Sequence, residues 1–256
     1  MIRGSLQRIS NVDEAYEAEL FKLEDAHWWY RGRRRVLSAL IEVDRTGPFG
    51  RILDVGCGTG RNLQELRRYG DVVGVEPSAA AVSFARASEL PVQQAEAEAL
   101  PFDDATFDFI TALDVIEHIE DDRGALREMR RVLAPAGSAI ITVPAYQWLW
   151  SAHDDMNLHK RRYTATLLRD RAESAGWAVV RLTYFNSLLL PPIALHRRLQ
   201  SVIGRSSPTV NDFKRTPRGL NSLLEIPLRL EAAVIRRGLR FPAGVSLGAV
   251  LQPRGV

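Results

Sequence analysis

The chain has 256 residues and a hydrophobic content of 46%, enough for one large α/β domain with a full core and some appended segments. Its single cysteine, Cys57, excludes an internal disulfide framework and suits a reducing compartment. No apolar run approaches the roughly 18 residues of a spanning helix, and the N-terminus has no apolar signal core, so we expect a cytoplasmic protein.

The net charge of +3 is unevenly distributed along the chain. Residues 186–256 hold 11 basic and 3 acidic residues, a net charge of +8, whereas residues 1–185 carry a net charge of −5. Basic character confined to one end favours contact between that end and an anionic partner.

Residues 12–43 are predicted to be helical, with an acidic first half. Residues 27–30 (His-Trp-Trp-Tyr) are interpreted as an apolar face that docks this helix on the domain. A lid over a bound ligand is the alternative, because aromatic rings attract cationic groups. Arg33 to Arg35 are interpreted as a solvated face. Gly47 and Pro48 then break the chain ahead of the first strand.

A strand, a glycine-rich turn and a helix follow one another over residues 51–69. Gly56, Gly58 and Gly60 allow a tight turn and let a ligand approach the main chain, because no Cβ stands in the way. Glu76 closes a second apolar strand 20 residues after Gly56, a spacing that suits a carboxylate bound to the two hydroxyls of a ribose. The segment is therefore predicted to bind a nucleotide.

Two residues indicate which nucleotide binds. A dinucleotide fingerprint, G-x-G-x-x-G, would need glycine at position 61, where Arg61 stands. Asp54, two residues before the first glycine, would repel a pyrophosphate but attract an amino or sulfonium group. Adenosine with a cationic amino-acid tail fits both, and this is S-adenosyl-L-methionine. The run Leu-Asp-Val-Gly-Cys-Gly-Thr-Gly over residues 53–60 resembles motif I of the class I methyltransferases that use this cofactor.

Helices and strands continue to alternate along the chain. One helix, capped by Ser78, runs through Ser88, and another begins at the cap Thr164. A third begins at residues 121–122 and is ended by Pro135 and Gly137. Strands are expected near residue 92 and over residues 107–113, 138–143 and 177–185. This alternation predicts a doubly wound, Rossmann-like α/β sheet whose ligand lies at the carboxyl ends of the strands.

The last predicted strand, residues 245–251, would be the antiparallel seventh strand of the methyltransferase fold, beside strand six. A short hairpin ordinarily joins these two strands, but about sixty residues separate them here. We therefore expect an N-terminal helical cap (1–46), a Rossmann-like domain that binds S-adenosylmethionine (47–185), a basic amphipathic helical insertion (186–243) and the final strand of the seven-stranded sheet (244–256).

Residues 96–102, 107–110 and 114–119 are similar to the segment that follows motif I in the broad family containing the ubiquinone and menaquinone biosynthesis methyltransferases. In that family an acidic residue at position 96, usually aspartate, hydrogen-bonds the adenine amine, and here it is glutamate. The resemblance covers residues 50–185 and does not identify the acceptor. It implies these cofactor-binding residues: Asp54, Gly56, Gly58, Gly60, Glu76, Pro77, Glu96, Ala97 and Leu113.

Methyl transfer from a sulfonium requires the protein to align the acceptor, to exclude water and, for a hydroxyl or ammonium acceptor, to remove a proton. His118 lies just beyond strand four, beside the expected position of the methyl group, and is the candidate base. A scaffolding role for Glu117 and His118, in which hydrogen bonds hold the loop, is equally favoured.

Residues 146–163 follow strand five, where this fold builds its substrate pocket, and supply the further catalytic candidates His153 and Tyr163. A solvated loop is the alternative. We favour a pocket for a polar aromatic or phosphorylated acceptor, because Trp148 and Trp150 are expected to be covered rather than left in solvent.

The leading prediction is a site without a metal, and a metal site is the alternative. Asp114-x-x-Glu117-His118 resembles an E-x-x-E-H cluster with which some related O-methyltransferases hold a divalent ion. Aspartate replaces the first glutamate, and a fourth ligand would have to come from His153 or His159.

The insertion at residues 186–243 sets leucines beside arginines, as interfacial helices do. Peripheral contact with a membrane, here the inner membrane surface, is one interpretation. Packing against the sheet and a homodimer interface are the others.

The sequence as a whole predicts a methyltransferase acting on an oxygen, nitrogen or carbon atom of a small-molecule acceptor, with aromatic or lipid-linked acceptors among the options. Asp54 and Arg61 disfavour a nicotinamide-dependent oxidoreductase. No nucleic-acid partner is expected, because the Asn/Asp-Pro-Pro-Tyr/Phe tetrapeptide of exocyclic-amine methyltransferases does not occur. A non-catalytic S-adenosylmethionine-binding regulator and a metal-assisted O-methyltransferase remain the alternatives.

Overall fold

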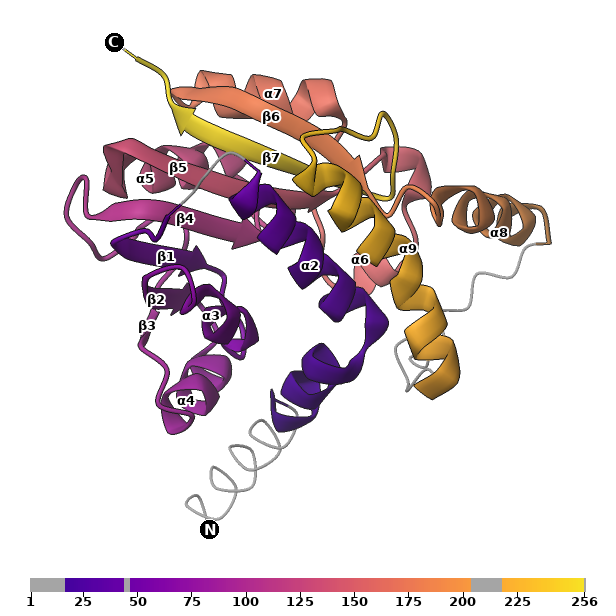
Figure 1. Cartoon of the computed structure of the whole chain (residues 1–256), viewed down its shortest axis with the longest axis horizontal. Coiled ribbons are helices and arrows are strands. Elements are labelled where there is room, and N and C mark those ends of the chain that lie inside the picture. Colours follow the sequence, from indigo (N-terminus) through magenta and orange to yellow (C-terminus); the bar gives the residue numbers. More distant parts are fainter. Residues whose placement is uncertain (1–16, 44–46, 204–217, 256) are drawn as a thin grey trace.

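One seven-stranded sheet forms the centre of the protein (Figure 1). The computed structural model describes residues 17–43, 47–203 and 218–255. The strand order is β3-β2-β1-β4-β5-β7-β6, and β7 runs antiparallel to both of its neighbours. The strands are β1 (Arg51–Val55), β2 (Asp71–Glu76), β3 (Val92–Gln94), β4 (Phe107–Leu113), β5 (Leu133–Pro144), β6 (Trp177–Phe185) and β7 (Ser246–Pro253). The predicted doubly wound sheet with an antiparallel last strand beside strand six is confirmed.

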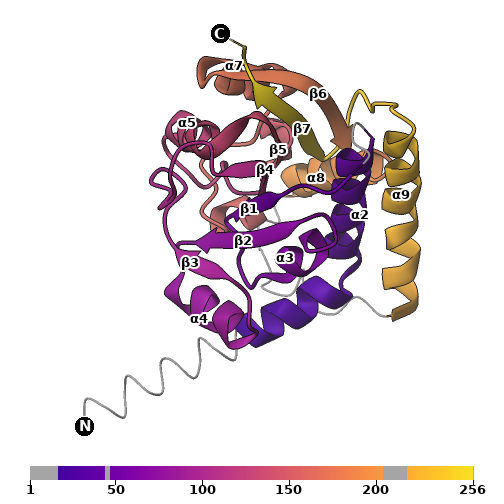
Figure 2. The same ribbon diagram turned by 60° about the vertical axis from the view of Figure 1, so that its left-hand side comes forward.

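Helices cover both faces of the sheet, as the two views show (Figures 1 and 2). Side chains of α5 and α7 pack in the core on one face, and those of α2 and α9 pack on the other. Because both faces are covered, the central strands are apolar almost throughout rather than alternating. The helices are α2 (Trp28–Glu42), α3 (Arg61–Leu66), α4 (Ala79–Ala87), α5 (Asp122–Val132), α6 (Ala152–Met156), α7 (Ala165–Ser174), α8 (Leu190–Ile203) and α9 (Arg218–Arg236), with a further helical segment over residues 17–26.

Helix starts follow the capping residues in the sequence. The side chains of Ser78 and Thr164 accept hydrogen bonds from the backbone N–H of the third residue of α4 and of α7, which confirms both predicted caps. The predicted N-terminal helix is interrupted at His27, whose extended backbone and Nδ1 acceptor make it the N-cap of α2. The helix predicted to run to Pro135 ends at Val132, because the chain pairs with β4 from Leu133 onward.

Helix α9 is part of the domain core, although it belongs to the segment predicted to be an insertion. Leu228, Ala232 and Ile235 are buried against the face of the sheet that α2 covers. Gly32 on α2 allows this close approach, since a Cβ there would lie 2.3 Å from the side chain of Leu228. The α9 part of the predicted insertion is therefore not a detachable cap. Residues 204–217 of this segment lie outside the described residues.

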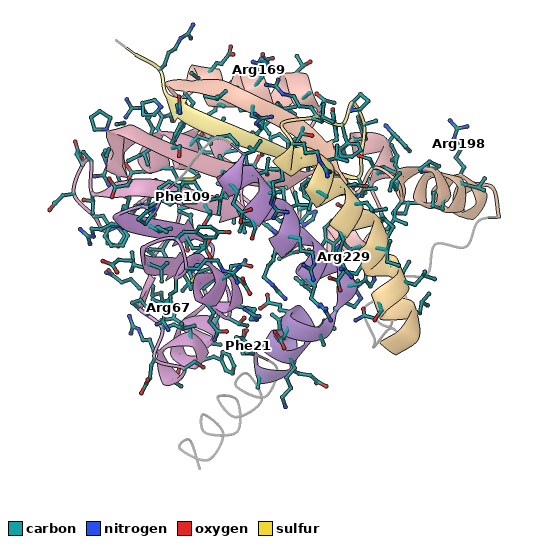
Figure 3. The ribbon with its side chains drawn as sticks, in the orientation of Figure 1. Phe21, Arg67, Phe109, Arg169, Arg198 and Arg229 are labelled. Carbon is teal, nitrogen blue, oxygen red and sulfur yellow. The ribbon has the colours of Figure 1, made fainter. Side chains whose placement is uncertain are left out.

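The exposed side of α8 and α9 carries both apolar and cationic side chains. Leu195 on α8 and Leu223 on α9 are each 60% exposed, and Arg198 and Arg229 are exposed as well (Figure 3). Despite these apolar residues, none of the helices in the described ranges is long and apolar enough to cross a membrane.

Candidate active site

The glycine-rich turn after β1 lies at the carboxyl edge of the sheet, beside the end of β2. Gly56, Gly58 and Gly60 all have positive φ, at 67°, 55° and 84°, which explains the alternating glycines. A Cβ at Gly56 would lie 2.6 Å from Val115, and one at Gly60 would lie 2.4 Å from Leu90. A Cβ at Gly58 would meet nothing within 4 Å. Gly58 thus leaves open space where a ligand can approach the main chain.

Glu76 ends β2 and is held against the turn. The N–H of Gly58 donates to Oε2 at 2.9 Å, and the N–H of Ser78 donates to Oε1 at 3.0 Å. Each carboxylate oxygen retains a further lone pair, because a carboxylate accepts about four hydrogen bonds. The backbone therefore orients Glu76 and leaves it able to accept from two ribose hydroxyls.

Asp54 lies buried beneath the turn. Its Oδ1 accepts a hydrogen bond from the hydroxyl of Thr111 at 2.5 Å, and its Oδ2 has no partner among the described residues. Burial raises the pKa of Asp54 to about 7, against the opposing effects of Thr111 and the nearby Arg33. A cationic group near the turn would stabilise the ionised carboxylate, so the site suits a cofactor with a positively charged tail.

The helical segment 17–26 lies beside the glycine-rich turn and α4. Thr59 donates a hydrogen bond to Glu24, and Arg61 forms an ion pair with Asp25 at 2.9 Å. Phe21 packs against Phe84 of α4, with ring centroids 5.6 Å apart (Figure 3). The N-terminal segment therefore borders the cofactor site through acidic and aromatic side chains.

The aromatic cluster preceding the arginines has a packing role. Trp28 and Trp29 pack against the core, and Trp29 stacks on Phe185 of β6 at 6.3 Å, which confirms the predicted docking of this helix.

The prediction of a solvated arginine face is wrong for two of the three arginines. Arg33 and Arg34 are each only 9% exposed. Arg33 lies 2.5 Å from the carboxylate of Asp114 at the end of β4, and Arg34 donates to the carbonyl of Glu24 at 2.7 Å. Only Arg35 remains half exposed, paired with Glu225 of α9. Arg33 thus connects α2 to the end of β4, and Arg34 connects α2 to the helical segment at residues 17–26.

The other residues implied for the cofactor lie along the same edge. Pro77 and Glu96 are exposed at the ends of β2 and β3, and Ala97 and Leu113 are buried. Their cofactor contacts stay predictions.

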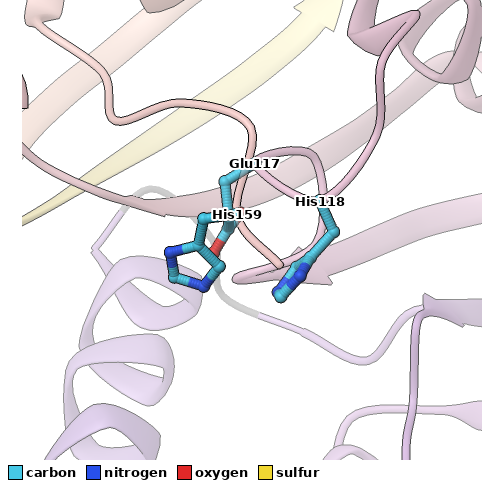
Figure 4. Close-up of side chains that lie close together, drawn as sticks. All are labelled: Glu117, His118 and His159. Carbon is cyan, nitrogen blue, oxygen red and sulfur yellow. The ribbon is translucent and has the colours of Figure 1, made fainter. Parts of the chain in front are cut away.

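Three potential metal-ligating side chains, those of Glu117, His118 and His159, gather just beyond β4. One nitrogen or oxygen atom from each lies within 4.8 Å of the others (Figure 4). Glu117 is fully buried, and neither of its oxygens has a hydrogen-bond partner among the described residues. Burial raises the pKa of Glu117 well above its usual range, and burial together with His159 lowers the pKa of His118.

Asp114 does not join this group, although the sequence-based alternative included it. One of its oxygens is paired with Arg33, and the other accepts from the hydroxyl of Thr142 at 3.1 Å. Among the two histidines considered as a further ligand, His159 lies in the group and His153 lies beside it, with ring centroids 6.2 Å apart.

A buried network that sequence reasoning missed orients His159. Its Nδ1 lies 2.9 Å from Oδ1 of Asp154, a fully buried carboxylate. Arg162 donates to the same carboxylate at 2.7 and 3.0 Å, and the N–H of Ser151 donates at 2.8 Å. These hydrogen bonds lower the pKa of Asp154 although burial opposes them. The S-x-x-D pattern of residues 151–154, a capping box, is the one sequence signal for this network.

Tyr163 is fully buried, and its hydroxyl donates to Asp122 at 2.8 Å. Burial and that carboxylate raise the pKa of Tyr163. Such a placement favours a structural role for Tyr163 over the catalytic role predicted for it.

The expectation that both tryptophans after β5 are covered is wrong for one of them. Trp148 is 57% exposed while it stacks on Tyr146 at 5.6 Å, and Tyr146 stacks in turn on Tyr184 of β6 at 5.2 Å. The indole N–H of Trp150 donates to Asp155 at 2.9 Å. The segment that contains His159 therefore also presents a partly exposed aromatic surface.

Comparison with known proteins agrees with this geometry. Residues 53–141 match the family model described as a methyltransferase domain. A ubiquinone/menaquinone biosynthesis C-methyltransferase of Geobacter sulfurreducens is 38% identical over 120 residues, 42% of this chain and 47% of that protein. An O-methyltransferase of Penicillium expansum is 38% identical over 100 residues, 35% of this chain and 36% of that protein. The chain thus spans less than half the length of these relatives.

The fold has a counterpart over most of the chain. A putative methyltransferase solved in complex with the Trm112 methyltransferase activator of Haloferax volcanii has a TM-score of 0.61 and 21% identity, covering 94% of this chain and 96% of that one. At this identity the likeness shows the fold alone.

The strand order, the glycine-rich turn after β1 and the family match together identify residues 53–141 as a methyltransferase domain of the class I kind, whose cofactor is S-adenosyl-L-methionine.

Proposed function

We propose that the protein transfers the methyl group of S-adenosylmethionine to an oxygen, nitrogen or carbon atom of a small-molecule acceptor. The observation that carries the proposal is the position of Glu117, His118 and His159 just beyond β4, on the same edge of the sheet as the glycine-rich turn. In doubly wound folds this edge receives the ligands.

The residues present fit the cofactor. Asp54 offers a buried oxygen without a hydrogen-bond partner among the described residues, Gly58 leaves open space, and Glu76 presents an oriented carboxylate. When bound, the cofactor supplies a methyl group attached to a good leaving group. The chain's own residues then have to hold the acceptor in line and keep water away.

Acceptor binding is assigned in this proposal to the segment after β5 and the end of β4. Tyr146, Trp148 and Tyr184 form a stacked series of rings there, which suits an aromatic or otherwise planar acceptor. The group of Glu117, His118 and His159 is assigned the activation of the acceptor.

The matched relatives include one named for C-methylation and one named for O-methylation. They support methyl transfer to a small molecule without fixing the acceptor atom.

The test is mass spectrometry of products after the purified protein is incubated with methyl-labelled S-adenosylmethionine and fractionated cell extract. We expect one extract component to gain a labelled methyl group while S-adenosylhomocysteine accumulates. Cofactor binding without any labelled product would favour a non-catalytic regulator instead.

We further propose that the exposed side of α9 contacts an anionic lipid surface from which a lipid-linked acceptor is taken. Leu223, Ile226 and Leu230 are 43–60% exposed there, on the side of the helix opposite Leu228. An amphipathic helix in a globular domain normally shows one apolar face, and α9 has two. Exposed arginines beside the second face would add a salt-sensitive attraction to anionic headgroups.

A further inference from the structure

The group of Glu117, His118 and His159 has a composition and setting typical of a metal centre. Two imidazoles and one carboxylate form the donor set of many zinc and other first-row transition-metal sites that keep coordination positions open for a substrate. Neutral imidazole nitrogens favour these ions over magnesium or calcium, which prefer all-oxygen surroundings.

Glu117 is the first reason to expect a cation. Its side chain is fully buried, and both of its oxygens lack a partner among the described residues. A buried carboxylate without a partner is costly unless it is protonated or a cation binds it. The two cations that act on Glu117 electrostatically, Arg33 and Arg162, are paired with Asp114 and Asp154 instead.

His159 gives a second, independent reason. The buried carboxylate of Asp154 lies 2.9 Å from its Nδ1, so this nitrogen carries the proton and Nε2 presents a lone pair. Metal-binding histidines are typically oriented in this way by a carboxylate on the second ring nitrogen. Arg162 in turn holds Asp154 with two hydrogen bonds, so the orientation of the imidazole is built into the fold.

Only a small movement separates the observed geometry from coordination. The three ligand atoms lie within 4.8 Å of one another. Ligands about 2.1 Å from one ion lie roughly 3 to 3.5 Å apart, so the side chains must close by about an ångström. His118 is the most exposed of the three, and its ring meets that of His159 edge to face at 4.6 Å, so we assign most of that shift to the His118 side chain.

We infer that Glu117, His118 and His159 bind one divalent first-row transition-metal ion, and that this ion holds and acidifies the oxygen of a hydroxyl or enol acceptor. The catalytic part of this inference rests on the proposed methyltransferase function. The acceptor oxygen loses its proton to solvent and attacks the methyl carbon. A C–O bond forms as the C–S bond breaks, and the electron pair of the broken bond remains on sulfur in S-adenosylhomocysteine.

The binding test uses the full chain after treatment with a chelator and dialysis. Co²⁺ is titrated and followed by visible absorption, and Zn²⁺ is titrated by calorimetry. We expect one ion per chain, with affinity lowered at least tenfold in Glu117→Gln and in His159→Ala. Glu120→Gln is the matched control, because Glu120 is an acidic residue of the same loop whose side chain is 84% exposed. It should bind as the wild type does.

Melting temperatures without metal show whether each variant is folded. Added Zn²⁺ should raise the melting temperature of the wild type and of Glu120→Gln but not that of Glu117→Gln or His159→Ala. If the wild type binds neither ion below about 1 mM, or if the two ligand variants bind as tightly as the wild type, the metal site is refuted.

Measuring methyl transfer with chelator and with added metal distinguishes a failure of the metal inference from a failure of the proposed function. Methyl transfer that stops with chelator and returns with Zn²⁺, Mn²⁺ or Co²⁺ supports the catalytic part. Unchanged methyl transfer in chelator overturns that part while the methyltransferase function stands. Cofactor binding without methyl transfer under any metal condition refutes the proposed function, and with it the catalytic part, while a metal site found by titration would remain.

Discussion

The proposed cofactor side and the proposed acceptor side of the site are built in different ways. The cofactor side is a continuous stretch, from Asp54 through the glycine-rich turn to Glu76, in which the backbone forms the turn and holds the Glu76 carboxylate. The acceptor side joins Glu117 and His118 to His159, which lies about forty residues further along the chain, and its orientation depends on the buried carboxylate of Asp154. A backbone cradle can be recognised from local sequence, whereas a side-chain cluster depends on tertiary packing.

Substitutions on the two sides should impair different properties, namely the rate of methyl transfer and the affinity for the cofactor. The largest effect is expected on the acceptor side. His118→Ala should lower the rate of methyl transfer about a hundredfold or more, because it removes the group that activates the acceptor. S-adenosylmethionine affinity, measured by calorimetry, should stay within about twofold of the wild type. A variant that loses cofactor affinity as strongly as rate would show that the two sides are not separate.

Gly58 offers the converse test on the cofactor side. Gly58→Ala should weaken S-adenosylmethionine binding at least tenfold, because a Cβ would enter the space left open for the ligand and the residue would be strained at φ +55°. The melting temperature should fall by only a few degrees, because the Cβ meets no protein atom within 4 Å and the cost is limited to a backbone strain of about 1–2 kcal/mol. Gly176→Ala is the control. Gly176 has φ +88° and equally open surroundings, but it lies between the end of α7 and the start of β6, at the sheet edge opposite the glycine-rich turn. Normal cofactor binding by Gly58→Ala would refute the assigned approach to the main chain.

Asp54 makes the cofactor side dependent on pH. Its pKa of about 7 reflects burial, opposed by Thr111 and Arg33 and reinforced by Glu76 and Glu24. Because a cationic ligand favours the ionised carboxylate, affinity should fall about tenfold between pH 8 and pH 6. Calorimetry at the two pH values checks this, and Asp54→Asn should remove the dependence. A wild type whose affinity does not change with pH would contradict it.

The raised pKa of Asp54 also predicts how the stability of the unliganded protein depends on pH. The pKa is raised in the folded state above its ordinary value of 3.8, so the folded protein binds the proton more tightly than the unfolded chain does. The free energy of unfolding should therefore decrease as pH rises from about 4 to about 7, by up to about 4 kcal/mol. Asp54→Asn should flatten that slope in denaturant titrations.

The smallest effect on the free energy of unfolding is expected from substitutions on the exposed side of α9. Leu223→Glu combined with Leu230→Glu should abolish co-sedimentation with anionic vesicles at low salt, yet change the free energy of unfolding by only about 0.5 kcal/mol. Leu228→Ala, on the buried side, should instead cost about 2–5 kcal/mol. Absence of vesicle binding by the wild type at low salt would leave the second apolar face to an oligomer contact.

Local sequence signals predicted those parts of the fold that depend on local chemistry. Positive-φ glycines, the caps Ser78 and Thr164 and the apolar runs of the strands each act within a few residues, and each was correctly predicted. The break at His27 was missed, because a histidine N-cap is uncommon and its Nδ1 acceptor becomes evident only in the folded geometry.

Parts of the site that depend on distant contacts could not be predicted from the sequence. In the sequence, Arg33 belongs to an arginine run of the kind that usually lies on the surface. In the fold, α2 lies beside the end of β4, where Arg33 pairs with Asp114. That pairing also removes Asp114 from the predicted metal cluster, while the network around Asp154 selects His159 over His153. Packing of α9 on α2 joins segments almost two hundred residues apart, as the hydrogen bond from the Trp28 N–H to Asn221 shows.

Binding of S-adenosylhomocysteine to the wild type and to Glu76→Ala tests the central claim most directly. Calorimetric titration should give one site per chain in the wild type, no binding of NAD, and affinity at least tenfold lower in Glu76→Ala, because the oriented carboxylate would no longer accept from the ribose hydroxyls. Equal affinity in the two proteins would contradict the ribose assignment, and binding of NAD in place of S-adenosylhomocysteine would contradict the account as a whole.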